Sequence, residues 1–290
     1  MLQSTWRLAV LSLVSIFFLV DSVAAFAPSA KQQRAVVYRQ ESSPLVAAMT
    51  NTNTDVNPQF VGLALLLDDG TRKSHSIAQN SAFVSGFFRG LSTREAYRAL
   101  LTSLYFVYQS MEDAFDRTHE GRVQVLDNAE LRRMDALERD MDYFYGPDWR
   151  SLISPSPATL VYVERVQKVA DKSPYLLVAH QYSRYLGDLF GGQMMSGMAT
   201  RSLDLKDNKG VDFYKFEEIA SVKDFITSWY QKLNALDLTL EEQEKIVDEA
   251  NLVFDLNIAI LEELEGSPFR AMWTLAINTI KVKFGISKYQ

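Results

Sequence analysis

The chain has 290 residues, of which 47% are hydrophobic and 23% charged, with a formal net charge of −6 and no cysteine. This length allows one or two domains with a substantial hydrophobic core. The absence of cysteine excludes disulfides and thiolate metal sites, so a bound iron needs histidine, methionine, tyrosine or carboxylate ligands.

The N-terminal residues have the composition of a targeting leader. Arg7 precedes the apolar run 8–20 and small residues follow it, which predicts a signal peptide over residues 1–25. Residues 26–54 are basic, rich in hydroxyl groups and poor in acids, as in a transit peptide or a disordered leader. This bipartite layout resembles leaders of plastids bounded by extra membranes, as in diatoms, and predicts delivery to the chloroplast stroma. An ordinary secreted protein is the alternative. The apolar run is too short for a membrane span, so we expect no transmembrane segment in the mature chain.

The charge of the chain after this leader disfavours polyanionic partners. Residues 1–50 hold four basic and two acidic residues, so the remainder carries 26 Lys and Arg against 34 Asp and Glu, a net charge of −8. Such a surface repels nucleic acid and anionic lipid on average. We expect a monomer with no nucleic-acid partner. The stretch 269–283 is expected to close the core as a helix, with an amphipathic membrane contact as the alternative.

From residue 55 onward the sequence predicts helices throughout. Two capping boxes and two hydroxyl-proline pairs mark helix starts: Ser92–Glu95, Thr239–Glu242, Ser156-Pro157 and Ser173-Pro174. The helices that begin at the capping boxes are expected to end near Thr118 and Gly266, and another helix is expected over 127–145. The sequence has no clear hairpin signal and no internal repeat. It therefore predicts one all-α domain over residues 55–290.

The run 181–195 predicts a helix that is interrupted by glycines. Its apolar face repeats at three- and four-residue spacing through Tyr182, Tyr185, Leu186 and Leu189. Three glycines interrupt it, each at a cost of about 1 kcal/mol relative to alanine: Gly187, Gly191 and Gly192. Because Gly187 and Gly191 are four residues apart, they share one face, with Arg184 and Asp188 beside them. Bare backbone flanked by a guanidinium and a carboxylate predicts a floor for a planar ligand. The alternative is a kinked core helix packed closely on a neighbour.

His75 is the candidate for an axial ligand of a planar group. The other two histidines have structural interpretations: His119 lies at a polar helix end, and His180 is expected to be a structural hydrogen bonder. Gln79 is one turn after His75, so its Oε1 could accept Nδ1–H and leave Nε2 free for a metal. Arg72, one turn before, could meet an anion. A lone histidine on an apolar helix is more often a core residue, but an imidazole combined with the glycine helix would suit haem.

Two segments, 70–80 and 184–193, resemble the proximal and distal helices of the haem oxygenase family, nearest to its plant and cyanobacterial branch. Further segments follow in the family's order: 103–108, 144–149, 155–158, 162–165, 176–180 and 246–250. The resemblance implies a mostly helical fold that holds haem between a proximal helix and a glycine-kinked distal helix. It also implies that haem is both cofactor and substrate, and that O₂ and reduced ferredoxin open the ring to biliverdin, CO and ferrous iron.

The same resemblance implies roles for individual residues. His75 matches the iron ligand, Gly187 and Gly191 match distal glycines that lie close over the haem, and Asp188 matches a carboxylate that orders distal water. Arg184 matches a motif position from which it would tether Asp188. The remaining residues expected to bind haem are Arg72, Gln79, Tyr182, Tyr185, Gly192 and Lys223.

Three positions depart from the family pattern where basic residues near the haem edge are usual: Asp68, Ile226 and Tyr230. The anchors of the haem propionates therefore stay open, with Arg72, Lys73, Lys223 and Tyr182 as candidates. These departures motivate an alternative function, a non-catalytic haem-binding or haem-sensing protein on the same scaffold. A third hypothesis is another helical enzyme that acts on a small heterocycle.

Overall fold

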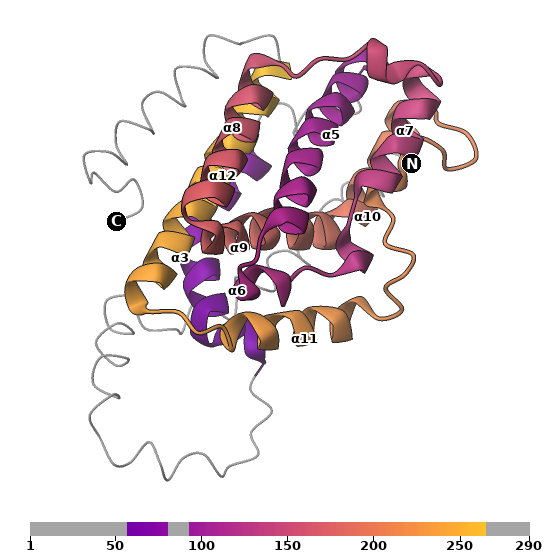
Figure 1. The fold of residues 1–290 in the computed structure, drawn as a ribbon. Coiled ribbons are helices and arrows are strands. Elements are labelled where there is room, and N and C mark those ends of the chain that lie inside the picture. Colours follow the sequence, from indigo (N-terminus) through magenta and orange to yellow (C-terminus); the bar gives the residue numbers. More distant parts are fainter. Residues whose placement is uncertain (1–56, 81–92, 265–290) are drawn as a thin grey trace, which may run out of the picture. The chain divides into compact units, whose positions relative to one another are not determined.

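The structure is a computed structural model that describes residues 57–80 and 93–264. The leader predicted over 1–54 and the closing helix predicted over 269–283 lie outside these residues. Throughout the described ranges the regular structure is helical and contains no strand (Figure 1). This confirms the predicted all-α fold class. No helix in the same ranges combines the length and the apolar character needed to cross a membrane.

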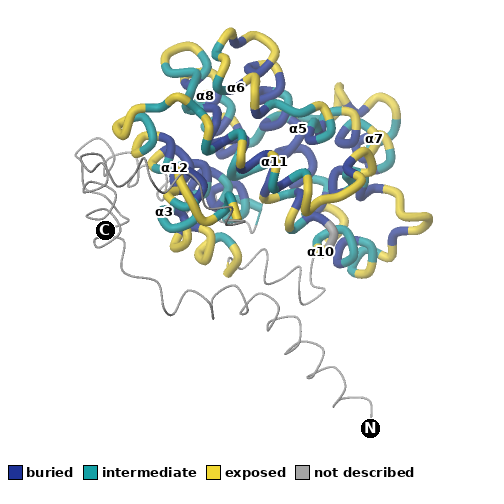
Figure 2. The backbone as a smooth tube through the Cα atoms, turned by 90° about the horizontal axis from the view of Figure 1, so that it is seen from below, coloured by how far each residue is buried: buried dark blue, intermediate teal, exposed yellow. Residues whose placement is uncertain are grey.

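Long helices form the framework of the described residues. They are α3 (Gly62–Gln79), α5 (Arg94–Arg117), α7 (Met134–Tyr145), α8 (Pro157–Lys172), α11 (Val222–Asn234) and α12 (Leu240–Leu264). Short helical turns connect them: η2 (Pro58–Phe60), α6 (Gly121–Gln124), η3 (Ala129–Leu131), η4 (Trp149–Ser151), η5 (Pro174–Leu176) and η7 (Asp212–Tyr214). α12 packs along α3 and α8, and α5 packs against α7 and α8 (Figure 1). In Figure 2 the buried residues concentrate where these helices meet.

A further helical run crosses this framework. It consists of α9 (Leu177–His180), the π-helix η6 (Gln181–Leu186) and α10 (Gly187–Ser202), which follow one another without a break. α9 and η6 pack against α12, and α9 also contacts α5. This run holds the predicted glycine helix, and we call it the distal helix. The position of the distal helix between α5 and α12 decides which side chains can reach it.

The predicted helix starts are confirmed at Ser156 and Thr239, whereas at Ser173 a short 3-10 helix begins at Pro174 as predicted but the Ser173 side chain makes no capping hydrogen bond. Ser156 caps α8 by accepting the Thr159 N–H at 3.3 Å. Thr239 and Glu242 form a reciprocal capping box before α12, with N···O distances of 2.9 and 3.2 Å. The cap of α5 is Thr93, which accepts the Ala96 N–H at 3.1 Å, so this helix starts one residue later than the predicted box.

The helix predicted over 127–145 is wrong in its first part. The structure has η3, a break at Arg132 and Arg133, and then α7. Arg133 explains the break, because its guanidinium donates to the carbonyls of Leu131 and Glu130, at 2.9 and 3.1 Å. Carbonyls that bind this side chain are unavailable for a regular helical ladder.

A close seam between α3 and α12 sets the rotation of α3. A Cβ added at Gly70 would collide with Val247, so the two helices approach closely there. The Ser74 hydroxyl lies 2.7 Å from Asn251 Oδ1, and Asn251 Nδ2 donates to the Gly70 carbonyl at 3.0 Å. Because His75 follows Ser74 directly, this buried seam also fixes the direction of the imidazole.

Candidate functional site

The centre of the distal helix is a π turn. η6 has six residues in π-helical conformation, and α10 begins at Gly187 immediately afterwards. Such wide turns are rare and occur often at functional sites. Sequence periodicity predicted a helix here, but it did not predict the π geometry.

The three glycines of the distal helix have two different environments. A Cβ added at Gly187 or Gly191 would meet no atom of the described residues within 4 Å. A Cβ at Gly192 would lie 3.2 Å from the Tyr214 carbonyl oxygen. Gly187 and Gly191 therefore offer bare backbone to open space, as a planar ligand requires. Gly192 is buried, and its lack of a side chain is explained by close packing on η7.

Asp188 lies between the two open glycines and is held from both sides. The Tyr108 hydroxyl on α5 donates a hydrogen bond to Asp188 Oδ2. Arg184 Nη2 lies 3.5 Å from the same oxygen, and Arg184 Nη1 donates to Asn257 Oδ1 on α12 at 2.8 Å. Burial raises the pKa of Asp188 well above its usual range and lowers the pKa of Arg184. The predicted tether between Arg184 and Asp188 is therefore present, and it extends to α5 and α12.

Tyr185 packs the distal helix against α5. It is only 2% exposed, and its hydroxyl donates to Glu112 Oε1 at 3.4 Å. Its ring packs edge-on against Tyr108, with the ring centroids 5.0 Å apart. The structure thus places Tyr185 against α5, away from the open glycines.

His75 presents an exposed imidazole on α3. Its ring packs edge-on against Phe254 of α12, with the centroids 5.7 Å apart. The surrounding protein lowers the pKa of His75 by desolvation, against the attraction of Asp68. The neutral form is the one that binds a metal. Among the described residues no hydrogen bond joins His75 to Gln79, and the second-sphere role of Gln79 stays a prediction.

α12 contacts both the helix that carries His75 and the distal helix that carries the open glycines. Phe254 contacts the His75 ring, and Asn257, one turn further along α12, accepts the hydrogen bond from Arg184. The Tyr182 hydroxyl of η6 also interacts with Thr71, one turn before His75 on α3. Three separate segments are therefore joined around the same region. The imidazole and the open glycines belong to helices that share these contacts.

The residues proposed as propionate anchors come from three elements: Arg72 and Lys73 from α3, Tyr182 from η6 and Lys223 from α11. Arg72 is exposed and forms ion pairs with Asp68 at 3.2 Å and Asp69 at 2.7 Å. Lys223 is exposed on α11, and Tyr230 is buried on the same helix. The charge of Asp68 adds to the rise that burial causes in the pKa of Tyr182 and Tyr230. Asp68 thus lies close enough to influence Arg72, Tyr182 and Tyr230.

Several site residues were not predicted individually. Tyr108 lies within a segment that carried the resemblance, but Asn257, Phe254 and Glu112 were not singled out. For Glu112 a signal exists, because an acid four residues after Tyr108 falls on a strongly apolar helix face. No comparable pattern distinguishes Asn257 from other polar residues of α12.

Comparisons with known proteins place this geometry in a family. A family model described as "Heme oxygenase" matches residues 61–263. The chain is 40% identical over 221 residues to a heme oxygenase of Porphyra purpurea, and the alignment covers 76% of this chain and 93% of that protein. It is 37% identical over 222 residues to heme oxygenase 1 of a Nostoc species, with coverage of 76% and 93%.

A solved structure agrees with these matches. The crystal structure of heme oxygenase-1 from the cyanobacterium Synechocystis in complex with heme aligns with a TM-score of 0.69 at 40% identity, over 76% of this chain and 100% of that chain. The chain belongs to the haem oxygenase family, in its plant and cyanobacterial type. Haem, as substrate and cofactor, is therefore the group against which the site has to be judged.

The residues of the site fit haem. The glycine pair leaves space where a flat macrocycle can approach the backbone, and the neutral His75 offers a nitrogen ligand. The buried Asp188 supplies a polar group between the glycines. These three features belong to this chain and stand independently of the comparisons.

Proposed function

We propose that this protein is an enzyme that opens haem to biliverdin and releases CO and ferrous iron, with O₂ as the oxidant. The observation that carries the proposal is the pair of open glycines, Gly187 and Gly191, on either side of the largely buried Asp188. When bound, the haem supplies the iron chemistry that activates O₂. A protein that only stored haem would have no evident need for a buried carboxyl at that position.

The chain's own residues would have separate tasks in this reaction. His75 would ligate the iron through its neutral imidazole. Gly187 and Gly191 would let the distal backbone lie close to the ring and restrict which edge is attacked, an effect of proximity. Asp188 would hold a proton beside the reacting atoms, while Tyr108 and Arg184 keep its carboxyl in place.

We also propose that the electron donor is reduced ferredoxin in the plastid stroma. The relatives in Porphyra purpurea and Nostoc support a photosynthetic setting, and the predicted bipartite leader supports plastid import. Because the chain without residues 1–50 has a net charge of −8, an acidic donor would need a local basic surface for docking.

For the propionates we propose Lys223 as the main cation, assisted by the Tyr182 hydroxyl. Arg72 is less available because two aspartates already bind it. Asp68 would repel a nearby propionate. The lack of basic residues at Ile226 and Tyr230 is the observation that favours the second candidate function, a haem-binding or haem-sensing protein on the same scaffold.

A haem titration followed by turnover tests the proposal. The protein is loaded with haem, given O₂ and reduced ferredoxin, and followed by absorbance for loss of the Soret band and formation of biliverdin. His75→Ala should lose the histidine-ligated spectrum and turnover, whereas His119→Ala, an exposed histidine on the loop after α5, should keep both. Asp188→Asn should keep haem binding but lose about 100-fold in turnover. Haem that binds but is released rapidly and unchanged, with no biliverdin formed, would support the haem-binding protein instead.

A further inference from the structure

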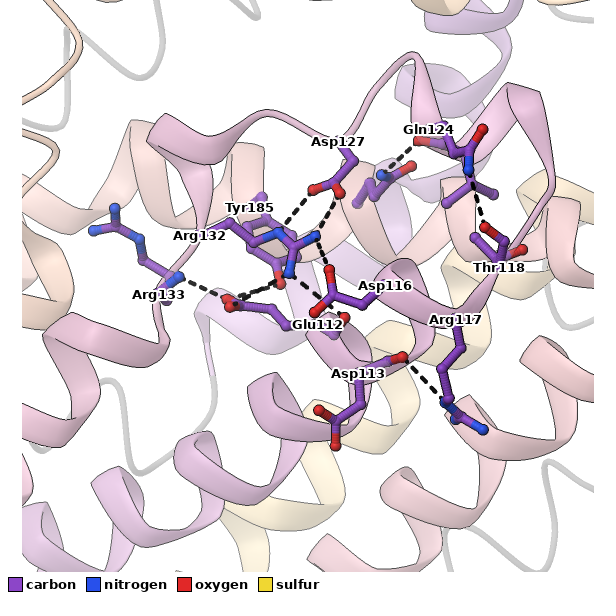
Figure 3. A network of polar contacts seen from close by, with 12 residues as sticks. Glu112, Asp113, Asp116, Arg117, Thr118, Gln124, Asp127, Arg132, Arg133 and Tyr185 are labelled. Carbon is purple, nitrogen blue, oxygen red and sulfur yellow. Dashed lines mark hydrogen bonds and ion pairs between the residues drawn. The ribbon is translucent and has the colours of Figure 1, made fainter.

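Glu112 is a buried acid on α5, on the face of α5 that packs against the distal helix. It is 7% exposed and lies four residues after Tyr108 on the same face of α5. Its Oε1 accepts the Arg133 backbone N–H at 2.7 Å and the Tyr185 hydroxyl at 3.4 Å (Figure 3). The proposed catalytic scheme makes no use of this carboxyl.

The arginines around Glu112 are engaged elsewhere. Arg132 Nη1 lies 3.9 Å from Glu112 Oε2, whereas Arg132 Nη2 lies 2.5 Å from Asp127 and 2.8 Å from Asp116 (Figure 3). The guanidinium of Arg133 points away from Glu112 in Figure 3 and stacks 3.9 Å from the centre of the Phe216 ring. Glu112 therefore has no guanidinium hydrogen-bonded to its carboxylate: its partners are the backbone N–H groups of Arg133 and Met134, the Tyr185 hydroxyl and the more distant charge of Arg132.

This arrangement leaves the charge of Glu112 poorly compensated. Burial raises the pKa of Glu112 to about 7, in spite of the opposing hydrogen bonds and the Arg132 charge. The neighbouring arginines stay charged around neutral pH, since the pKa of Arg132 is raised and that of Arg133 is lowered only to about 10. Burial raises the pKa of Tyr185, which keeps its hydroxyl protonated.

Other charged groups face this site from neighbouring elements. Asp127 follows α6, Asp116 lies on α5, and Glu218 in the loop before α11 acts on Arg133. Asp127 and Asp116 have Arg132 as their partner. Glu112 differs because its nearest hydrogen-bonding side chain is neutral Tyr185.

Two hydrogen bonds from neighbouring turns of α5 reach the distal helix. Tyr108 donates to Asp188, and Glu112 accepts from Tyr185, three residues earlier in the π turn. The Tyr185 and Tyr108 rings also touch edge to face. A change at Glu112 is thereby transmitted, through one tyrosine, to the segment that carries Asp188 and the open glycines.

We propose that Glu112 is a positioning residue for haem opening, whose ionisation strengthens the hydrogen bond from Tyr185 and so holds the π turn and the glycines more firmly on α5. This inference rests on the proposed function. The physical cause is that an ionised carboxylate accepts a stronger hydrogen bond than a neutral carboxyl, whose own proton competes for the same partner. Within the folded state, where Glu112 stays buried, the distal helix should therefore be held more tightly on α5 above neutral pH than below it, even though ionisation of this buried acid lowers the free energy of global unfolding.

Amide hydrogen exchange of the haem-free full chain tests this without turnover. Exchange of residues 181–191 by local opening of the folded protein, corrected for the intrinsic pH dependence, should slow about fivefold from pH 6 to pH 8, the size expected for one net hydrogen bond. Glu112→Gln keeps the shape and one acceptor oxygen but cannot ionise, so its corrected exchange should be the same at both pH values. Asp113→Asn is the matched control, because this exposed acid is adjacent on α5 and points away from Tyr185 (Figure 3).

Turnover gives the second readout. The kcat for biliverdin formation should rise through an inflection near pH 7 in the unchanged protein, and the inflection should disappear in Glu112→Gln while KM stays constant. Tyr185→Phe, which removes only the donor, should also flatten the exchange profile. If Glu112→Gln keeps the pH-dependent exchange of the unchanged protein, the positioning role is wrong. If exchange behaves as expected but no biliverdin forms, the proposed function fails and the coupling within the helix remains.

Discussion

Two buried glutamates contact the distal helix at opposite ends of its π turn, and they differ in how their charge is balanced. Glu249 on α12 contacts His180, the residue before the turn, with Nε2 and Oε1 3.2 Å apart. Glu112 on α5 contacts Tyr185 near the end of the turn. Burial favours the neutral form of both acids. Even so, the pKa of Glu249 is lowered to about 2, while that of Glu112 is raised to about 7.

The difference comes from the partners. Arg165 forms a forked pair with Glu249, with one N···O distance of 2.9 Å, and His180 adds a further hydrogen bond. Arg132 is shared between two aspartates and stays 3.9 Å from Glu112. A dedicated guanidinium therefore outweighs the desolvation of a buried acid, and a shared one does not. One end of the π turn is fixed across neutral pH, whereas the other can respond to it.

The largest loss of stability is expected when the ion pair between Glu249 and Arg165 is broken. Glu249→Gln removes the charge that Arg165 needs, and unpairing a buried ion pair costs about 3–5 kcal/mol of unfolding free energy at pH 7. Because the pKa of Glu249 lies below its usual 4.5, its stabilisation is present above pH 4.5 and is lost as pH falls towards 2. Urea unfolding at pH 7 and pH 3 measures the difference.

In that experiment Glu244→Gln, an exposed position on the same helix, serves as the control and should change stability little. A Glu249→Gln protein that is as stable as the unchanged one at pH 7 would contradict the assignment of this pair as the fixed end.

The pH dependence of the unfolding free energy that comes from Glu112, at the other end of the π turn, should have the opposite sign. Because the pKa of Glu112 is raised from 4.5 to about 7, the folded state binds this proton more tightly than the unfolded state. Stability is then highest below pH 4.5 and falls by up to about 3 kcal/mol as pH rises through 7. Glu112→Gln should remove this fall, so unfolding free energies of the two proteins should diverge in its favour between pH 5 and pH 8. Parallel pH curves would show that Glu112 is ionised in both states.

The smallest change in stability is expected at the glycines that follow the π turn, which differ in whether their Cβ position is open or crowded. Gly187→Ala should stabilise the haem-free protein by up to about 1 kcal/mol, since its Cβ meets open space and alanine favours helix. Gly192→Ala should gain nothing, because its Cβ would crowd the Tyr214 carbonyl. Thermal unfolding compares them, and a haem titration should show weakened binding for Gly187→Ala. Haem affinity unchanged in Gly187→Ala would remove this glycine from the haem-facing surface.

Local features of the molecule were determined by the sequence itself. The capping box at Thr239 and the proline cap at Ser156 formed as predicted, since each depends on neighbours three residues away. The shared open face of Gly187 and Gly191 also follows from spacing along one helix. Residue patterns that act over one turn can be interpreted without knowledge of the fold.

Only the tertiary structure decided the partners that come from distant segments. Asn257 reaches Arg184 and Glu112 reaches Tyr185 from positions 73 residues away in each case. In the described part of the chain no hydrogen bond joins Gln79 to His75, although the two residues are one turn apart. The sequence specified which side chains lie on each helix face, but their charge states depend on desolvation and on donors from other helices. The charge states of these side chains are therefore set only when the helices pack against one another.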